Sequence, residues 1–388
     1  MVTTGVDVLC ATLPEKLKNK RLGLLCNPAS VGKNLTHSRF LINNAFPGQL
    51  VALFSPQHGF FAEKQDNMIE SDHMLDSILG IPVYSLYGET RWPTPDMMAK
   101  IDVLLIDLQD VGTRVYTFMY TVSYCMEAAK AAGVTVIVLD RPNPIGGAVV
   151  EGNVLNPKFT SFVGRYPICM RHGLTMGELA FLFNEKFGIG CDLEIIKMTD
   201  WKRNMMWPET GLTWIPPSPN LPTFLSAVVY PGQVLWEGTN VSEGRGTTLP
   251  FELLGAPYID GDFLISKVDG PFHPGCILRP VIFEPTSNKW AGQQCGGIHI
   301  HVIDPKQYEP FKMSLRFLKN IRQYWSNDFK WKEDPYEYEM ERPAIDMIMG
   351  TDIVRVNLEA GSCARSLCTG FIDEISMYAK EIKPYYLY

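Results

Sequence analysis

The sequence predicts an α/β fold, in which a Rossmann-like, doubly wound and mainly parallel sheet is followed by a smaller α+β domain. Over the first 200 residues or so, short apolar runs alternate with longer segments of helical spacing. Strands that alternate with helices form crossover units, which place the strands parallel to one another. After this region the chain becomes rich in Trp and Pro and then in Gly. We therefore expect a Rossmann-like domain at residues 1–205 and a second, α+β domain at residues 206–388.

The expected elements follow from local patterns taken in chain order. Short segments rich in apolar residues predict strands, and they occur at residues 21–26, 51–54, 84–87, 103–108, 134–139 and 193–196. The uniformly apolar run at 51–54 predicts a strand that is buried on both faces. Helical spacing is expected at residues 36–44, from 95 onward, at 116–133 and at 175–187.

The second domain begins with a proline-rich segment. Residues 215–223, IPPSPNLPT, predict a stiff extended linker. Residues 298–302 alternate between apolar and polar side chains as a half-exposed strand does, and a helix is expected near 311–324.

Composition excludes several classes of protein. A net charge of −7 and a pI near 5.6 argue against a nucleic-acid binder, and no run approaches the roughly 18 apolar residues of a membrane helix. The nine cysteines lack CxxC pairs, which favours buried thiols in a reducing compartment. No signal peptide is visible at the start of the sequence, so we expect a cytoplasmic protein. A periplasmic or secreted location stays open for a chain whose signal peptide was removed.

The sequence predicts neither a cofactor nor a metal. It lacks GxGxxG, GxxxxGK[ST], HExxH and GxSxG motifs. Cys363 and Cys368 lie five residues apart without a third ligand nearby, and His299 and His301 share one face of a predicted strand in the same situation. The chemistry must therefore come from side chains in the loops.

Polar residues follow five consecutive predicted strands at their carboxyl ends. In a parallel sheet these ends meet at one edge, where ligands bind. Arginines bind carboxylates in a bidentate manner, amides bind hydroxyls, and a pair of carboxyl groups can flank a glycosidic bond. The sequence therefore predicts one site for an acidic, polyhydroxylated ligand. Its candidates are Asn27; Gln57, His58 and Glu63; Glu89 and Arg91; Asp107, Gln109, Asp110 and Arg114; and Asp140, Arg141 and Asn143.

Structural interpretations stay open at several of these positions. Asp107 is equally suited to a structural role, as a buried strand-end acid that caps the next helix or pairs with Arg141, and residues 140–144 also fit an Asx-type turn stiffened by prolines. His58 has the alternative of a purely structural histidine. In the Gly-rich stretch at 236–248, Glu237 and Arg245 also fit an ordinary ion pair within a loop.

Ordered motifs along nearly the whole chain resemble one family. They include SPQHGF (55–60), PVYSLYG (82–88), IDVLLIDLQDVGTRVYTF (101–118), VLDRPNP (138–144), HGLTMGELA (172–180) and EGTNVSEGRGTTLPFE (237–252). They resemble the DUF1343 family, which includes the exo-β-N-acetylmuramidases called NamZ. The resemblance implies a Rossmann-like catalytic domain, a smaller C-terminal domain and an active-site cleft between them. It also implies a glycoside hydrolase that removes terminal N-acetylmuramic acid from the non-reducing ends of peptidoglycan fragments.

The chain departs from this family at one catalytic position. Family members commonly have P-E-H-G where this chain has Gln57, and an amide does not transfer a proton as a carboxylic acid does. Given this departure, we expect Glu63, six residues later in the same loop, to be the general acid, with Glu70 as the second candidate. We expect Asp107 or Asp110 to be the partner base or stabiliser, and His58 with Gln57 to position the sugar.

The remaining roles are also those that the resemblance implies. Glu237 and Arg245 would close the cleft, and the sugar's lactate, acetamido and hydroxyl groups would be bound by Asn27, Arg91, Arg114, Tyr116, Asp140, Arg141 and Asn143. The partner is a muramic-acid-containing glycan or muropeptide, and the reaction requires no cofactor. Two alternatives remain open: a non-catalytic protein that binds muropeptides or sugars, and a hydrolase of another acidic glycoside.

Overall fold

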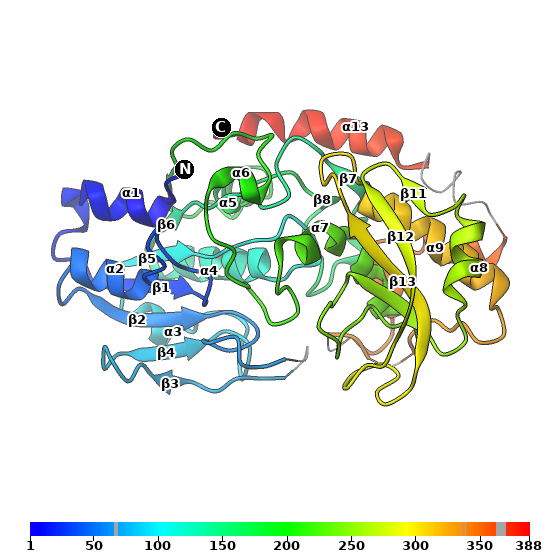
Figure 1. Cartoon of the computed structure of the whole chain (residues 1–388). Helices are drawn as coiled ribbons and strands as arrows, with labels where there is room; N and C mark the ends of the chain where they lie inside the picture. The colour runs from blue at the N-terminus through cyan, green and yellow to red at the C-terminus, as the bar shows by residue number, and fades with distance from the viewer. Residues whose placement is uncertain (66–68, 334, 338, 362–369) are drawn as a thin grey trace.

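Two β-sheets lie at opposite ends of the molecule, with helices packed around and between them (Figure 1). The structure is a computed structural model, and it describes residues 1–65, 69–333, 335–337, 339–361 and 370–388. The first sheet belongs to the N-terminal half of the chain and the second to the C-terminal half, as the change of colour in Figure 1 shows.

The larger sheet has seven strands in the order β3-β4-β2-β1-β5-β6-β9. All neighbouring strands are parallel except β3, which runs antiparallel to β4 at one edge. Numbered along the chain, the parallel strands lie in the order 3-2-1-4-5-6, the order of the Rossmann fold. The predicted fold class is thus confirmed. The strands are β1 (Leu22–Cys26), β2 (Leu50–Ser55), β3 (Met74–Leu75), β4 (Pro82–Ser85), β5 (Val103–Asp107), β6 (Thr135–Leu139) and β9 (Leu193–Ile196).

Both faces of this sheet are covered, as the apolar runs predicted. Leu24 belongs to the hydrophobic cluster under α1 (Gly5–Thr12) and α2 (Ser38–Ala45), whereas its neighbour Leu25 belongs to the cluster on the opposite face. Helices α4 (Phe118–Ala132) and α5 (Met176–Glu185) pack against that opposite face, and α3 (Pro95–Met98) lies against α4.

The smaller sheet is antiparallel, with the order β10-β13-β12-β11. Its strands are β10 (Leu253–Ala256), β11 (Phe272–His273), β12 (Cys276–Phe283) and β13 (Cys295–Val302), and α8 (Gly261–Lys267) packs against it. The predicted strand at 298–302 and helix at 311–324 are confirmed within β13 and α9 (Pro310–Tyr324).

Several elements had no clear signal in the sequence. Helix α7 (Phe224–Gln233) starts directly after the proline-rich segment, and β7 (Glu151–Val154) pairs with β8 (Cys169–Arg171) in a separate two-stranded sheet. The other helices are α6 (Trp207–Thr210), α10 (Ala344–Met349), α11 (Ile353–Glu359) and α13 (Ile372–Glu381), and the short 3₁₀ helices are η1 (Glu15–Leu17), η2 (Pro157–Phe159), η3 (Val234–Gly238) and η4 (Lys383–Tyr385).

The end of the chain returns to the first half of the molecule. Helix α13, red in Figure 1, runs along the top of the view. The hydroxyl of Tyr378 donates to the carbonyl of His172 (2.9 Å), and that of Tyr388 donates to Asp140 (2.8 Å). The predicted boundary between residues 205 and 206 falls between the two sheets and stays a prediction.

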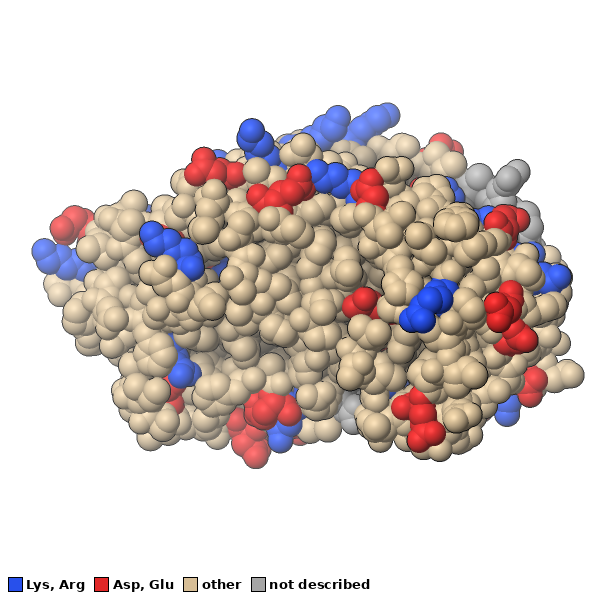
Figure 2. Space-filling model, viewed as in Figure 1, with Lys and Arg blue, Asp and Glu red and all other residues tan. Residues whose placement is uncertain are grey.

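No helix in the described part of the chain is long and apolar enough to cross a bilayer. On the face shown in Figure 2, acidic and basic side chains are interspersed. The seven described cysteines form no disulfide, and all except Cys10 are buried. Cys363 and Cys368 lie outside the described residues.

Candidate active site

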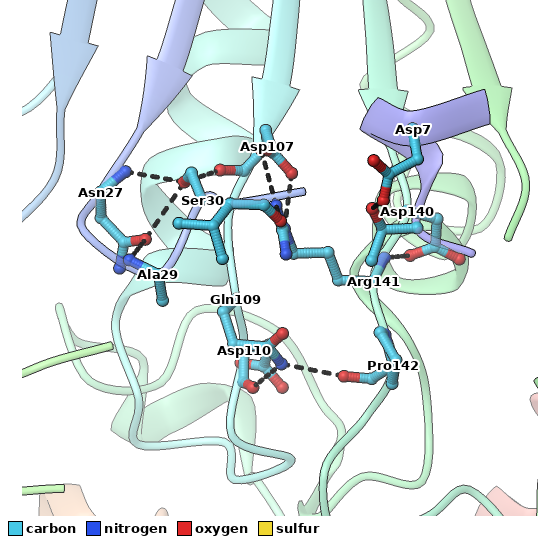
Figure 3. Close-up of polar contacts among 12 residues, drawn as sticks. Asp7, Asn27, Ala29, Ser30, Asp107, Gln109, Asp110, Asp140, Arg141 and Pro142 are labelled. Atoms are coloured by element: carbon cyan, nitrogen blue, oxygen red, sulfur yellow. Dashed lines mark hydrogen bonds and ion pairs between the residues drawn. The ribbon is translucent and has the colours of Figure 1, made fainter. Parts of the chain in front are cut away.

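The carboxyl ends of β1, β5 and β6 meet where the strand order reverses, and their polar side chains bond to one another (Figure 3). Asp107, at the end of β5, is fully buried and forms a bidentate ion pair with Arg141. Its Oδ1 lies 2.5 Å from Nε, and its Oδ2 lies 2.8 Å from Nη2. Bidentate pairs of this kind hold a fixed geometry. We therefore assign Asp107 and Arg141 a structural role, which is one of the alternatives that the sequence left open.

The other predicted binding residues at this edge hold loops in place. Asn27 donates to the carbonyl of Pro217 (3.0 Å) and accepts from the amide of Ala29 (3.1 Å). Asp140 accepts from the amide of Gly177 (2.7 Å) and the hydroxyl of Thr175 (2.7 Å) at the start of α5. Asn143 donates to the carbonyl of Leu174 and accepts from the amide of Ile145, which is an Asx-type turn.

Arg114 also acts inside the protein. Its side chain is fully buried, and burial lowers its pKa. The guanidinium donates to four carbonyl oxygens, those of Asn153 (2.8 Å), Ile168 (3.0 Å), Ile348 (3.2 Å) and Met349 (2.6 Å). It thus joins the end of α10 to the first half of the chain rather than facing a ligand.

Two predicted catalytic carboxylates, those of Asp110 and Glu63, form hydrogen bonds with other residues of the protein and lie outside the pocket described next. Asp110 is buried, and its Oδ2 accepts from the amide of Gly112 (2.6 Å) and lies 3.1 Å from Nε2 of His172. Glu63 is exposed; its carboxylate folds over Gly59 and accepts from the amide of Phe61 (3.1 Å). Neither carboxylate lines the pocket described next.

A pocket lies between the loop after β2, the start of α4 and segments of the C-terminal half. It contains about 450 Å³ of space free of protein atoms, including the part that opens to solvent. Five residues named from the sequence line it: Gln57, His58, Tyr116, Glu237 and Arg245. They are joined by Val115, Thr117, Phe118, Val163, Ser218, Asn220, Leu221, Tyr230, Phe251, Tyr336 and Glu337.

Among the described residues, this edge of the sheet carries a second hollow that is separate from the pocket. The second, of about 350 Å³, lies over the ends of β1 and β5 and is lined by Lys33, Gln109, Arg141 and Trp207 among others. It shares no lining residue with the pocket. The strand ends do meet as predicted, but the ion pair and the loop bonds fill the space between them.

The first carboxylate of the pocket is Glu237, which lies on η3. Its Oε1 accepts from Nη2 of Arg245 (2.6 Å), and its Oε2 accepts from the hydroxyl of Tyr336 (2.6 Å). Arg245 is also ion-paired with Glu243 (3.2 Å), and these two carboxylates raise its pKa. The result is a buried, charged wall in the pocket.

The second carboxylate of the pocket, Glu337, was not singled out from the sequence. It is 7% exposed, and its Oε2 accepts from the hydroxyl of Tyr87 (2.8 Å). Its Oε1 lies 3.4 Å from Nε2 of Gln57, whose own Oε1 accepts from the hydroxyl of Thr117 (2.8 Å). Burial raises the pKa of Glu337, and the positive charge of Arg91 opposes the rise. The sequence signal was weak: a Tyr-Glu run at 336–337 in what looks like a polar tail.

Three side chains of the pocket are carried by strained backbone. His58 (φ +79°), Phe251 (φ +65°) and Glu337 (φ +48°) lie in the left-handed region, which side chains disfavour. Such residues concentrate at ligand and catalytic sites, where the surrounding structure maintains them.

His58 presents a defined face to the pocket. Its Nδ1 lies 3.0 Å from the carbonyl oxygen of Lys64, and because a carbonyl can only accept, Nδ1 carries the hydrogen. Burial lowers the pKa of His58 to about 4, so the ring is neutral near pH 7 and its Nε2 is an acceptor.

In the described part of the chain, no three His, Cys, Asp or Glu side chains are grouped so as to hold a metal ion.

Comparison with known proteins agrees with this architecture. Residues 22–225 match the family model described as "Exo-beta-N-acetylmuramidase NamZ, N-terminal", and residues 228–388 match its C-terminal counterpart. The chain belongs to the NamZ family. The peptidoglycan beta-N-acetylmuramidase NamZ of Bacillus subtilis (strain 168) is 42% identical over 387 residues, which cover 100% of this chain and 91% of that protein.

Two crystal structures of DUF1343 family proteins from Bacteroides fragilis NCTC 9343 resemble this NamZ-family chain. One superposes with a TM-score of 0.89 at 32% identity and the other with 0.76 at 31%. Each comparison covers 100% of this chain and 99% of the other. The fold of this NamZ-family protein is therefore shared over its whole length.

Proposed function

We propose that this NamZ-family protein is a glycoside hydrolase that releases terminal N-acetylmuramic acid from the non-reducing ends of peptidoglycan fragments. One observation carries the proposal: the pocket brings together two buried carboxylates, Glu237 and Glu337. Glycoside hydrolysis commonly uses a pair of carboxyl groups, one that protonates the leaving oxygen and one that acts as base or nucleophile.

The other pocket residues suit an acidic amino sugar. The rings of Tyr116, Tyr230 and Phe251 supply apolar faces for a sugar ring. Nε2 of His58 can accept from a hydroxyl or from an acetamido N–H. Arg245 places a guanidinium in the wall, which favours a ligand that carries the lactyl carboxylate.

A groove next to the pocket fits the remainder of a longer substrate. It shares Asn220 and Arg245 with the pocket and contains about 1450 Å³ of space, including its open side. Its walls carry the hydroxyl groups of Thr247, Thr248, Thr286 and Ser287. An exo-acting enzyme binds the terminal sugar in one place and the rest of the chain beside it. Here the terminal sugar would occupy the pocket, and the rest of the glycan or muropeptide would lie along the groove.

Release of the sugar tests this proposal. The purified protein is incubated with 4-nitrophenyl β-N-acetylmuramide and with the disaccharide N-acetylmuramyl-β-1,4-N-acetylglucosamine, and free N-acetylmuramic acid is quantified. The matched control is the 4-nitrophenyl glycoside of N-acetylglucosamine, which lacks the lactyl group and should react at least tenfold more slowly. Binding of the muramide without release would instead favour a non-catalytic sugar-binding protein, the alternative that Gln57 raises. Equal rates on both glycosides would indicate a different glycoside as substrate.

We also propose that the protein works in a reducing compartment, namely the cytoplasm. Six of the described cysteines are buried and unpaired with one another, and burial raises the pKa of thiols such as Cys125 and Cys169, which keeps them unreactive. Fractionation of the source cells with an antibody against the protein tests this location; recovery outside the cytoplasmic fraction would contradict it.

A further inference from the structure

We propose that Glu337 is the general acid of this protein, and that Gln57 positions the Glu337 carboxyl. This inference rests on the proposed function and assigns the proton donor within it. It differs from the roles expected from the sequence, where Glu63 was the candidate acid.

The first step of the argument is location. Glu337 lines the pocket, is 7% exposed and approaches Gln57 from the C-terminal half of the chain. Glu63 is exposed and bonds to its own loop. A general acid must come within hydrogen-bond reach of the glycosidic oxygen, and of these two glutamates only Glu337 faces the cavity.

The second step separates Glu337 from Glu237. Both carboxylate oxygens of Glu237 accept hydrogen bonds, Oε1 from the guanidinium of Arg245 (2.6 Å) and Oε2 from the hydroxyl of Tyr336 (2.6 Å). Glu337 accepts from the phenol of Tyr87 and lies beside the amide of Gln57, and Arg91 places a positive charge near it. Two carboxyl groups in such different surroundings divide the roles of acid and base between them.

The third step concerns the charges that face Glu337. Burial and the negative charge of Glu237 raise its pKa, whereas Arg91 and the hydrogen bonds from Tyr87 and Gln57 lower it. His58 is neutral near pH 7 and adds no charge there. Because burial is the largest of these influences, Glu337 retains its proton to a higher pH than an exposed glutamic acid does.

The fourth step gives Gln57 its role. Thr117 donates to Oε1 of Gln57, which turns the amide nitrogen toward Glu337. Gln57 therefore acts through another residue and is a positioning residue. An amide does not transfer a proton as a carboxylic acid does, and the carboxyl group that can do so is that of Glu337 beside it.

The reaction balances with one water molecule. Glu337 gives its proton to the glycosidic oxygen while the bond from C1 to that oxygen breaks, and the electron pair of that bond leaves with the oxygen as a sugar hydroxyl. The oxygen of a water molecule becomes bonded to C1 of the muramic acid. The proton that the water gives up restores the two carboxyl groups to their starting state.

The variant Glu337→Gln tests the assignment with two substrates. Hydrolysis of N-acetylmuramyl-N-acetylglucosamine needs a proton donor, since its leaving group is an alkoxide, whereas 2,4-dinitrophenyl β-N-acetylmuramide has a leaving group that departs unprotonated. We expect kcat/KM to fall by about 10²- to 10⁴-fold on the disaccharide and by less than tenfold on the aryl glycoside. The fall in kcat/KM of the wild-type protein at high pH should also disappear in the variant.

Two further variants control for folding and for loss of a surface charge. Glu339→Gln changes a nearby glutamate that is ion-paired with Arg342, and it should leave both rates unchanged. Glu337→Asp keeps a carboxyl group but shortens its reach, so it should lower the disaccharide rate and retain the fall at high pH. This second variant serves as the test if Glu337→Gln fails to fold.

The outcomes are distinguishable. Equal losses on both substrates with an unchanged pH profile, or no loss on either, would overturn the assignment of Glu337 while the proposed function stands. Failure of the folded wild-type protein to release the sugar from either substrate would overturn the proposed function and this inference with it.

Discussion

Gln57 and Glu337 lie 280 residues apart in the sequence, and the amide nitrogen of the first lies 3.4 Å from a carboxylate oxygen of the second. This contact joins the loop after β2 of the Rossmann-like sheet to a segment of the C-terminal half. It places an amide against the carboxyl group to which we assign the proton transfer. Introducing an acid at residue 57 is therefore an informative change.

The variant Gln57→Glu should move the fall of kcat/KM at high pH upward, by about one pH unit or more. Two carboxyl groups at this separation resist being ionised together, so that one of them keeps its proton to a higher pH. Since an acid catalyst works in its protonated form, activity persists until the pH rises through that higher pKa. The measurement is kcat/KM on the disaccharide as a function of pH.

Thr117→Val is the matched control for this change. It removes the hydroxyl that donates to Gln57 and adds no charge, so it should lower kcat/KM and leave the position of the high-pH fall where it is. A downward shift in Gln57→Glu would contradict the interpretation.

Glu63→Gln should leave kcat/KM on the disaccharide within about twofold of wild type. The side chain is exposed and its described hydrogen bond is to Phe61 in the same loop, outside the pocket. Steady-state kinetics on purified protein settles the point. A loss of a hundredfold or more would return the role of acid to Glu63.

Asp107→Ala should destabilise the protein by about 3–5 kcal/mol, because it leaves the guanidinium of Arg141 buried without its carboxylate. Urea unfolding gives the free energy of unfolding, and kcat of the folded protein should stay close to wild type. Asp102→Ala breaks an ion pair of comparable geometry on the surface, with Arg21, and should have a much smaller effect. A large rise in KM without loss of stability would instead indicate a substrate-binding role for Asp107.

The groove predicts a dependence on substrate length. Thr248 is exposed and lines the groove, so Thr248→Trp should raise KM for a tetrasaccharide fragment several-fold and leave KM for the 4-nitrophenyl muramide unchanged. Ser326→Trp, at an exposed position outside the pocket and the groove, is the control. Equal KM values for the short and long substrates in all three proteins would show that the groove does not bind the glycan.

Stability should depend on the ionisation of Glu151, a residue of β7. Burial raises its pKa to about 7, and its Oε2 finds no hydrogen-bond partner among the described residues. The folded state thus binds this proton more tightly than the unfolded state. The resulting stability is complete below pH of about 4.5 and is lost as the pH rises through about 7.

Glu151→Gln removes this dependence and should stabilise the protein at pH 8 by about 1–3 kcal/mol relative to wild type. Free energies of unfolding measured at several pH values between 5 and 8 provide the check. Parallel curves for the two proteins would contradict the prediction.

The elements of the Rossmann-like sheet were predictable because their signals are local. A mainly apolar run such as residues 103–107 predicts a buried strand from neighbouring residues alone. The Gly after α4 likewise predicts the end of that helix to within one residue. The expected strand at 84–87 is displaced, since β4 ends at Ser85 and Tyr87 turns its hydroxyl to Glu337. The local sequence pattern does not predict this hydrogen bond, because its acceptor lies 250 residues away in the chain.

The candidate site was only partly predictable. Gln57, His58, Tyr116, Glu237 and Arg245 do line one pocket. Arg114 carries the same kind of signal, a polar residue after a strand, yet it is enclosed by carbonyl groups from β7, from Ile168 just before β8, and from α10. The residues that line the pocket and Arg114 cannot be told apart by residue type or by position relative to a strand. What distinguishes Arg114 is that backbone from distant parts of the chain covers it.

By itself, the sequence determined the α/β class, the family and the edge of the sheet at which polar side chains gather, because apolar periodicity and strand ends are properties of neighbouring residues. Tertiary structure alone decided which of those side chains neutralise one another and which face the cavity. Asp107 at the end of β5 forms an ion pair with Arg141 in the loop after β6. Glu337 contacts Gln57 although the two residues are far apart in the sequence. The cost of burying a charge or a polar group makes such pairings obligatory, and only the folded chain sets the distances that select the partners.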